Sequence, residues 1–267
     1  MTEFILTHQT AIRLAFFCAI LGAMMAWEAA APRRKLSAGR AGRWTSNLGI
    51  VALDAAMVRL VFPVAAVGVA AIAAERGWGL MNAVAAPGWM AIVLSVVVLD
   101  LAIYAQHLVF HKVPLLWRLH RMHHTDVDID TTTGIRFHPI EIGLSMAIKM
   151  GVIVVLGAPP AAVIIFEVLL NATSMFNHGN VQLPTNIDRA LRRVIVTPDF
   201  HRVHHSVYRD ETDSNYGFNL SIWDYLFGTY RAQPRDGHLG MKIGLEIFRA
   251  PLQRRLDKLL IQPFVKD

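Results

Sequence analysis

Long apolar runs separated by short polar stretches dominate the first half of the chain. The first covers residues 14–31 with a single charge, Glu28, and approaches the roughly 20 residues that a membrane-spanning helix needs. The second covers residues 48–74 and the third residues 89–110. Pro63 falls inside the second run, where the missing N–H of proline predicts a kink. The pattern therefore predicts three long transmembrane helices.

Two shorter apolar runs follow, over residues 142–157 and 161–176. Each has 16 residues, which is short for a complete span, and Pro159 and Pro160 separate them. We therefore expect a tight helical hairpin that enters the membrane and returns to the same side. From His178 onward the chain is mostly polar and basic, as expected for a cap outside the membrane.

These patterns predict an all-α fold, an integral membrane helical bundle of three long spans plus a helical hairpin, with a histidine-rich cap on one side. We divide the chain into N-terminal membrane helices with a basic loop (residues 1–90), a histidine-rich region (91–240) and an amphipathic, basic C-terminal segment (241–267). The last segment mixes apolar and basic residues at near-helical spacing. It is expected either to pack on the cap or to lie on the membrane surface.

The composition supports a membrane protein. Hydrophobic residues make up 54% of the chain and the mean hydropathy is +0.39. Charged residues make up 17%, against about 25% in soluble domains. A net charge of +6 can indicate a nucleic-acid partner, but basic loops of membrane proteins face the cytoplasm and contact anionic lipids. We therefore expect membrane lipids, and no nucleic acid, as partners.

The charge pattern also predicts an orientation. Five basic residues lie between Arg33 and Arg43, and the positive-inside rule places this loop in the cytoplasm. The N-terminus is then outside, and the histidine-rich cap and the C-terminus are cytoplasmic, in the inner (cytoplasmic) membrane. No cleavable signal peptide is expected, because the first apolar run leads through Trp27 into a basic loop and not into a small-residue cleavage site.

The histidines are concentrated in two places. Asp100, Tyr104, His107 and His111 are spaced at i, i+4, i+7 and i+11, so they share one stripe of a helix. A polar stripe on an apolar transmembrane helix is expected to face the protein interior. The sequence H-x-x-H-H then occurs twice, with histidines at i, i+3 and i+4 on one helical face. These are His120, His123 and His124, and His201, His204 and His205.

This arrangement predicts a metal site. Neutral imidazole is a common ligand for iron, zinc and copper, and eight converging histidines exceed what one ion can use. Two ions close together fit better. Asp100 is expected either to orient a ligand histidine through its second ring nitrogen or to neutralise a charge at the membrane boundary. The single cysteine, Cys18, excludes an intramolecular disulfide and a cysteine-ligated iron–sulfur cluster.

Several motifs extend beyond the histidine spacing. They are W-R-L-H-R-M-H-H-T-D, R-F-H-P-I-E, F-N-H-G-N, V-T-P-D-F-H-R-V-H-H-S, N-Y-G and I-W-D-Y-L-F-G-T-Y. Together with the histidines, they resemble the fatty acid hydroxylase superfamily and, within it, the sterol desaturase branch. The resemblance covers about residues 100–230. It is specific for the superfamily and does not identify a substrate.

The resemblance implies a non-haem di-iron centre that uses O2 as co-substrate, in a membrane-bound hydroxylase or desaturase. The substrate would be lipid-like, such as a sterol or hopanoid, a fatty acyl chain or an ether lipid. The region 91–240 would be the catalytic domain. Its catalytic, iron-binding residues, by their match to the motifs, would be His107, His111, His120, His123, His124, His178, His201, His204 and His205. His138 would be either a ligand or a neighbour of the ligands.

The sequence contains no Gly-rich dinucleotide motif and no haem motif, so a separate electron carrier and reductase are expected. Four basic residues are expected either to dock an acidic carrier or to act only as positive-inside charges. They are Arg189, Arg192, Arg193 and Arg202.

Two other classes of membrane protein would also bind metal. A metal transporter or sensor would need ligands along a path through the membrane, whereas these histidines gather at one face. A zinc-dependent hydrolase would need a general base, such as the Glu of H-E-x-x-H, and that motif is absent from the sequence.

The polar residues within the apolar runs include Asp54, Arg59, Glu167 and Asn171. Asp54 and Arg59 are expected to be either a buried pair or polar residues near the inner membrane boundary. Glu167 and Asn171 share one face of the hairpin and are expected to point inward, where they could line a pocket.

Overall fold

The computed structural model describes residues 2–266, which form helices joined by short loops. The longer helices are α1 (Thr2–Ala30), α2 (Arg40–Val61), α3 (Ala66–Glu75), α5 (Gly88–Lys112), α6 (Pro114–His124), α7 (Pro139–Leu156) and α8 (Pro160–Asn177). The shorter ones are α4 (Leu80–Ala83), η1 (Thr133–Ile135), α9 (Thr185–Leu191), α10 (Pro198–His204), α11 (Arg209–Thr212), α12 (Ile222–Leu226), α13 (Gly237–Gly240), η2 (Pro251–Arg254), α14 (Leu256–Ile261) and η3 (Gln262–Phe264). Two isolated antiparallel bridges are the only β-structure within residues 2–266. The predicted all-α class is confirmed.

Five segments are long and apolar enough to cross a membrane, and the chain is an integral membrane protein. They are Thr7–Ala30, Arg40–Ala83, Gly88–Lys112, Pro139–Leu156 and Pro160–Asn177. They overlap the five apolar runs of the sequence. Large apolar side chains on their outer surface are exposed, for example Leu60 at 82% and Val155 at 75%. Such exposure is expected where helices face lipid, because lipid tails are themselves apolar.

Prolines set the breaks in the apolar runs. The expected kink at Pro63 is a complete break, because α2 ends at Val61 and α3 begins at Ala66. In the hairpin, α7 ends in Gly157, which has a left-handed φ of +68°. A Cβ on this glycine would lie 2.6 Å from the Trp78 carbonyl oxygen, so only glycine fits. The helix α8 then begins at Pro160, where a proline costs no hydrogen bond.

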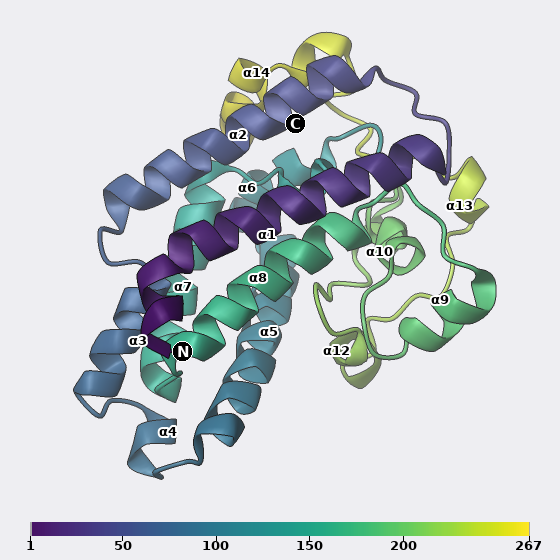
Figure 1. Ribbon diagram of the computed structural model, residues 1–267. Helices are drawn as coiled ribbons and strands as arrows, with labels where there is room; N and C mark the ends of the chain where they lie inside the picture. Colours follow the sequence, from purple (N-terminus) through teal and green to yellow (C-terminus); the bar gives the residue numbers. More distant parts are fainter. Residues whose placement is uncertain (1, 267) are drawn as a thin grey trace.

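The helix α5 lies in the middle of the bundle. It packs against α7 and α8, while α1 runs along α8 and α2 packs against α7 (Figure 1). The main apolar core includes Leu99 and Ile103 of α5, Ile153 of α7 and Phe166 of α8. This core holds the C-terminal end of α5, where His107 and His111 lie, in a fixed position relative to the hairpin.

The residues after His178 form the predicted cap, whose short helices gather on one side of the bundle (Figure 1). The C-terminal segment then turns back to α2, and Leu259 of α14 joins Ile50 and Met122 in a small apolar cluster. Of the two expected arrangements for this segment, packing on the protein is the observed one. It forms three short helices and not one amphipathic helix.

The basic loop between α1 and α2 is bound to the rest of the protein. The Arg33 guanidinium lies 3.2 Å from the Asp199 carboxylate of α10, and Arg34 donates to the Met241 carbonyl oxygen (2.9 Å). Arg43 is buried and pairs with two aspartates. Charges that the sequence indicated as loop charges are therefore partly internal ion pairs, and they tie this loop to the same side of the bundle as the cap.

Candidate metal centre

Nine histidines form two adjacent buried clusters. The first consists of His107, His111, His120, His124 and His204, and the second of His123, His178, His201 and His205. Within each cluster the possible ligand atoms, one per residue, all lie within 4.8 Å of one another. The structure thus brings together every histidine of the three motifs and His178.

The two H-x-x-H-H helices, α6 and α10, share their histidines between the clusters. Each helix gives its first and last histidine to one cluster and its middle one, His123 or His204, to the other. Successive helical residues turn by about 100°, so the positions i+3 and i+4 point in clearly different directions. Each triplet lies on one helical face, and within that face the middle histidine points to one cluster and the outer two point to the other.

Backbone carbonyl oxygens fix the orientation of four rings. The Nδ1–H of His107 donates to the Tyr216 carbonyl (2.7 Å), and that of His123 to the Arg136 carbonyl (3.1 Å). In the same way His178 donates to the Ser174 carbonyl and His204 to the Ser214 carbonyl, each at 2.7 Å. Because a carbonyl oxygen only accepts, the proton of these neutral rings is on Nδ1 and the lone pair is on Nε2.

Two carboxylates hold further rings. Glu141 Oε1 lies 2.6 Å from His120 Nδ1, and Asp213 Oδ1 lies 3.3 Å from His111 Nδ1. Carboxylates in this position fix the tautomer of a metal-binding histidine and make the ring a stronger ligand. The sequence pattern alone does not indicate these roles. Glu141 was visible only as the last residue of the motif R-F-H-P-I-E.

The opposite ring nitrogens face each other. The Nε2 atoms are 3.1 Å apart between His107 and His120, and 3.2 Å apart between His120 and His124. In the second cluster, His123 Nε2 and His178 Nε2 are 3.1 Å apart. Lone pairs that face each other repel unless a cation lies between them. Two nitrogens bound at right angles to one ion, each at about 2.1 Å, would be about 3 Å apart, so these distances fit shared metal ions.

Other ring nitrogens are buried without a hydrogen-bond partner among residues 2–266. They are Nε2 of His111, His204 and His205, and both nitrogens of His201. Buried polar atoms normally have a partner, because an unmet hydrogen bond costs free energy. A metal ion in each cluster would provide that partner.

Burial keeps the cluster histidines outside the membrane-spanning helices neutral. It lowers the pKa of His120 and of His178 from the ordinary 6.5 to about 3. Burial first, and then the charges of neighbouring histidines, hold the pKa of five others well below 6.5. These are His123, His124, His201, His204 and His205. The neutral ring is the form that binds a metal, so each cluster is a candidate metal site.

The histidine pattern of this site can be compared with that of known proteins. Residues 92–229, more than half of the chain, match the model of the family described as fatty acid hydroxylase. The chain belongs to the fatty acid hydroxylase family. The resemblance expected from the sequence motifs is therefore confirmed.

Curated relatives of this family member are lipid hydroxylases and monooxygenases. The chain is 31% identical to the ornithine lipid hydroxylase OlsE of Rhizobium tropici, over 65% of the chain and 50% of the relative. It is 30% identical to the alkylglycerol monooxygenase of Homo sapiens, over 50% of the chain and 29% of the relative. A cholesterol 25-hydroxylase-like protein of Danio rerio is 27% identical over 54% of the chain and 58% of the relative. The chain thus spans half or less of the first two relatives, and no solved structure matches it significantly.

Asp100 and Tyr104 bind the loop between residues 215 and 230, which in turn contacts His107. Within residues 2–266, Asp100 has no hydrogen bond to a histidine ring, contrary to one of the two expectations. Its Oδ2 accepts from the Leu220 N–H (3.1 Å) and the Trp223 indole N–H (2.8 Å). The Tyr104 hydroxyl lies 2.8 Å from Thr229 Oγ1. Both residues thus fasten the loop between residues 215 and 230, whose Tyr216 carbonyl binds His107.

His138 lies outside both clusters. Its Nδ1 accepts from the Ile140 N–H (3.2 Å) at the start of α7, and its Nε2 donates to the Leu260 carbonyl (3.1 Å). Both ring nitrogens are therefore used, and neither faces the other histidines. His138 and Glu141 belong to the same motif, R-F-H-P-I-E. Within this motif it is Glu141, and not His138, that contacts a cluster histidine, His120.

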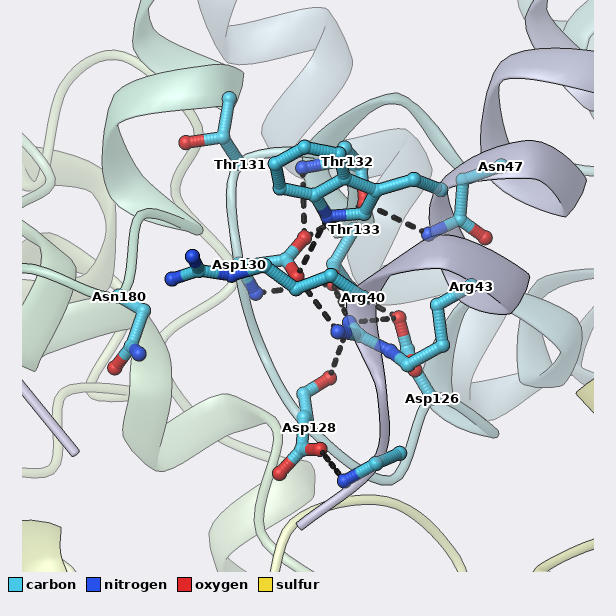
Figure 2. A network of polar contacts seen from close by, with 12 residues as sticks. Arg40, Arg43, Asn47, Asp126, Asp128, Asp130, Thr131, Thr132, Thr133 and Asn180 are labelled. Atoms are coloured by element: carbon cyan, nitrogen blue, oxygen red, sulfur yellow. Dashed lines mark hydrogen bonds and ion pairs between the residues drawn. The ribbon is translucent and has the colours of Figure 1, made fainter. Parts of the chain in front are cut away.

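A buried polar network holds the loop that connects the first H-x-x-H-H to α7. Arg43 of α2 points toward this loop, where two of its nitrogens bind the Asp126 carboxylate (both 2.7 Å) and a third binds Asp130 (2.6 Å) (Figure 2). Thr133 Oγ1 also donates to Asp126 (2.9 Å). Burial alone raises the pKa of Asp126, but the charges of Arg43 and Arg136 bring it down to about 2. Asp126 is therefore a carboxylate at neutral pH.

The end of α1 joins the same region. Glu28 Oε1 accepts from the Thr131 N–H and the Asn180 N–H (both 2.7 Å). These two residues lie in different loops, one after the first H-x-x-H-H and one directly after His178. Glu28 therefore fixes the two loops relative to each other, and with them the histidines on either side.

A cavity of about 480 Å³ lies among α1, α2, α5, α7 and α8, and His107 and His120 of the first cluster line it. Its wall is mostly apolar. Glu167 and Asn171 line it as well. Glu167 is buried and points inward as expected, whereas Asn171 is exposed. Glu167 accepts hydrogen bonds from Arg13 and from Lys149 (2.5 Å). Asp54 lines the cavity, while Arg59 is exposed, so the expectation of a buried pair between them is wrong.

The basic residues proposed for carrier docking differ in their positions. Arg202 is buried and pairs with Asp199, and Arg192 is buried and pairs with Asp188. Both are therefore structural. Arg189 and Arg193 are exposed on the cap.

Proposed function

We propose that this protein is a membrane-bound, O2-dependent non-haem di-iron hydroxylase or desaturase that acts on a C–H bond of a lipid-like substrate. The observation that carries the proposal is that the first histidine cluster lines an apolar cavity between helices that are long enough to span a membrane. Membership of the fatty acid hydroxylase family, and relatives named as lipid hydroxylases, support it.

One iron would be held by each cluster, the first with His107, His111, His120, His124 and His204, and the second with His123, His178, His201 and His205. A histidine-only set is suited to iron, and two ions would supply the binding and reduction of O2. Five imidazoles in one cluster exceed the four ligands of a closed zinc site. The contacts on Nδ1 hold six of these rings with Nε2 toward the ion, namely those of His107, His111, His120, His123, His178 and His204.

The rest of the chain would bind and orient the substrate. A lipid would enter the cavity from the bilayer, with its reactive carbon beside His107 and His120. The apolar wall would exclude water, which protects the reaction from side products. Hydroxylation places one oxygen atom of O2 in the substrate and reduces the other to water, which consumes two electrons and two protons.

The electrons would come from a separate carrier and reductase, and the exposed Arg189 and Arg193 are available for an acidic carrier. We further propose that the cap faces the cytoplasm from the inner membrane, with the N-terminus outside. The basic loop and the cap lie on one side of the bundle, as the ion pair of Arg33 with Asp199 indicates. Positive charge on this side favours a cytoplasmic location.

The test is a metal and product analysis of the full chain, purified in detergent from membranes. We expect two irons per chain, O2 uptake that depends on a reductant and a lipid extract, and lipid products with one added oxygen or two fewer hydrogens by mass spectrometry. One tightly held zinc, with no O2 uptake after reconstitution with iron, would overturn the proposal in favour of a hydrolase. Metal flux across proteoliposomes without lipid oxidation would favour a transporter.

A further inference from the structure

Two carboxylates in the cavity each have an oxygen atom without a partner. Asp54 Oδ1 and Glu141 Oε2 are buried, and neither has a hydrogen bond within residues 2–266. The two residues are only 9% and 5% exposed, and both line the cavity that reaches His107 and His120. They are also close enough to interact electrostatically. The cavity therefore contains two carboxyl oxygens without a hydrogen-bond partner, close to each other and beside the first cluster.

The cations of the cavity do not satisfy these acceptors. Arg13 and Lys149 both bind Glu167, so their positive charges are directed to one carboxylate on α8. The nearest basic residue along α2, Arg59, is exposed. Asp54 is thus a polar residue in the middle of an apolar segment with no partner from the chain, and ionisable residues in such places mark substrate sites in membrane proteins.

Glu141 places one of the free oxygen atoms next to the first histidine cluster. Its other oxygen, Oε1, binds His120 Nδ1 at 2.6 Å, so Oε2 is part of a side chain in direct contact with a cluster histidine. Gln106, which precedes His107, also lines the cavity, and its buried Oε1 has no partner within residues 2–266. Carboxylate and amide oxygens accept hydrogen bonds, so a hydrogen-bond donor on a ligand is the group that can satisfy all three atoms at once.

We propose that the substrate is a lipid whose polar group donates hydrogen bonds, an amine or a hydroxyl, to Asp54 and Glu141, so that the carbon attacked lies within a few bonds of that polar group. This inference rests on the proposed function, since it names the substrate class of the same site. Sites built to bind a donor reject analogues without it, because the acceptors are then left unpaired. A plain hydrocarbon chain would leave these carboxylates unpaired and would bind poorly.

Binding is tested on the detergent-solubilised full chain with three amphiphiles of equal chain length: dodecylamine, 1-dodecanol and dodecyltrimethylammonium, which has no donor. By native mass spectrometry we expect the amine or the alcohol to bind about tenfold more tightly than the trimethylated amine. Asp54→Leu should remove this preference, and Arg59→Leu, which removes a charge from the same helix outside the cavity, should keep it. No preference in the natural chain, or an unchanged preference in Asp54→Leu, would overturn the proposal.

A second variant separates the two donor chemistries. Asp54→Asn keeps an acceptor oxygen but not the negative charge, so it should weaken the binding of both cations, dodecylamine and dodecyltrimethylammonium, if the natural chain holds a cationic group. Unchanged binding of all three amphiphiles in Asp54→Asn would identify a neutral hydroxyl. A fold check by size-exclusion chromatography accompanies each variant.

Product analysis distinguishes failure of this inference from failure of the proposed function. In cells that express the natural chain, tandem mass spectrometry should locate the added oxygen, or the new double bond, on the fragment that carries the polar group. An oxidised lipid whose change lies far along an acyl chain would overturn the inference and leave the proposed function standing. The absence of any oxidised lipid would count against the proposed function itself.

Discussion

His123 and His204 are the middle histidines of the two H-x-x-H-H sequences, and each lies in the cluster that receives the other two histidines of the opposite helix. His123 of α6 joins His201 and His205 of α10, while His204 of α10 joins His120 and His124 of α6. This exchange means that neither cluster belongs to one helix. Both depend on α6 and α10 being side by side.

The exchange predicts which ion each substitution removes. His123→Ala should lower the metal content of the second cluster and His204→Ala that of the first, so each variant should retain about one ion per chain, with activity lost in both. Metal analysis of protein purified from membranes measures this. His8→Ala, at an exposed position on α1, is the matched control and should retain both ions. Full metal content in His123→Ala would remove that residue from the site.

The contact between Glu141 and His120 predicts a graded effect on metal affinity. Glu141→Leu should weaken metal binding about 10- to 100-fold, because residues that orient a metal-binding histidine have effects of this size. Glu141→Gln keeps an acceptor for His120 Nδ1 and should lose less. The readout is the rate of iron loss to a chelator.

Asp213→Asn gives a comparison for that experiment. Its contact with His111 is longer, at 3.3 Å, and we expect a smaller effect than in Glu141→Leu. Equal iron loss from the natural chain and Glu141→Leu would show that this hydrogen bond does not support the site.

The buried pairs of Arg43 predict a large effect on stability. Arg43→Leu removes the cation that binds both Asp126 and Asp130, and breaking a buried ion pair in this way costs about 3–5 kcal/mol. Thermal unfolding in detergent should therefore show a clear fall in Tm for Arg43→Leu. Lys35→Leu, which removes an exposed charge from the same loop, should leave Tm within error. An unchanged Tm in Arg43→Leu would contradict the role of this network.

The proposed orientation predicts the outcome of a reporter fusion. A reporter that is active only in the cytoplasm, fused after the last residue, should be active, and one that requires the outer side should not. Fusions in the loop between α3 and α5 should give the opposite result, because the second span ends on the other side. Activity of the outer-side reporter at the C-terminus would reject the orientation.

Much of the membrane part follows from local chemistry. The interruptions at Pro63 and at Pro159 follow from the missing N–H of proline, so the sequence predicts their positions. At Pro63 it indicated a kink, where the structure has a complete break. The inward direction of Glu167 follows from the cost of a polar side chain in lipid. These features need no knowledge of the rest of the fold.

The parts that the sequence missed depend on distant partners. In the sequence, Arg43 is one of several basic residues of an apparent loop. Its partner Asp126 is 83 residues away along the chain. Glu141 is 21 residues from His120, and no spacing rule links the two. The helical period places His123 and His124 at different angles, but only the position of α10 decides which cluster each one enters.

Glu28 and Arg43 lie outside residues 92–229, the part that matches the family model. Both nevertheless bind inside it, Glu28 to Thr131 and Asn180, and Arg43 to Asp126 and Asp130. A fragment cut at the limits of the family match would keep all nine histidines but would expose these acidic and amide groups without partners. The unit that can be transferred to another protein, or expressed alone, therefore has to begin with α1, although the recognisable motifs begin much later.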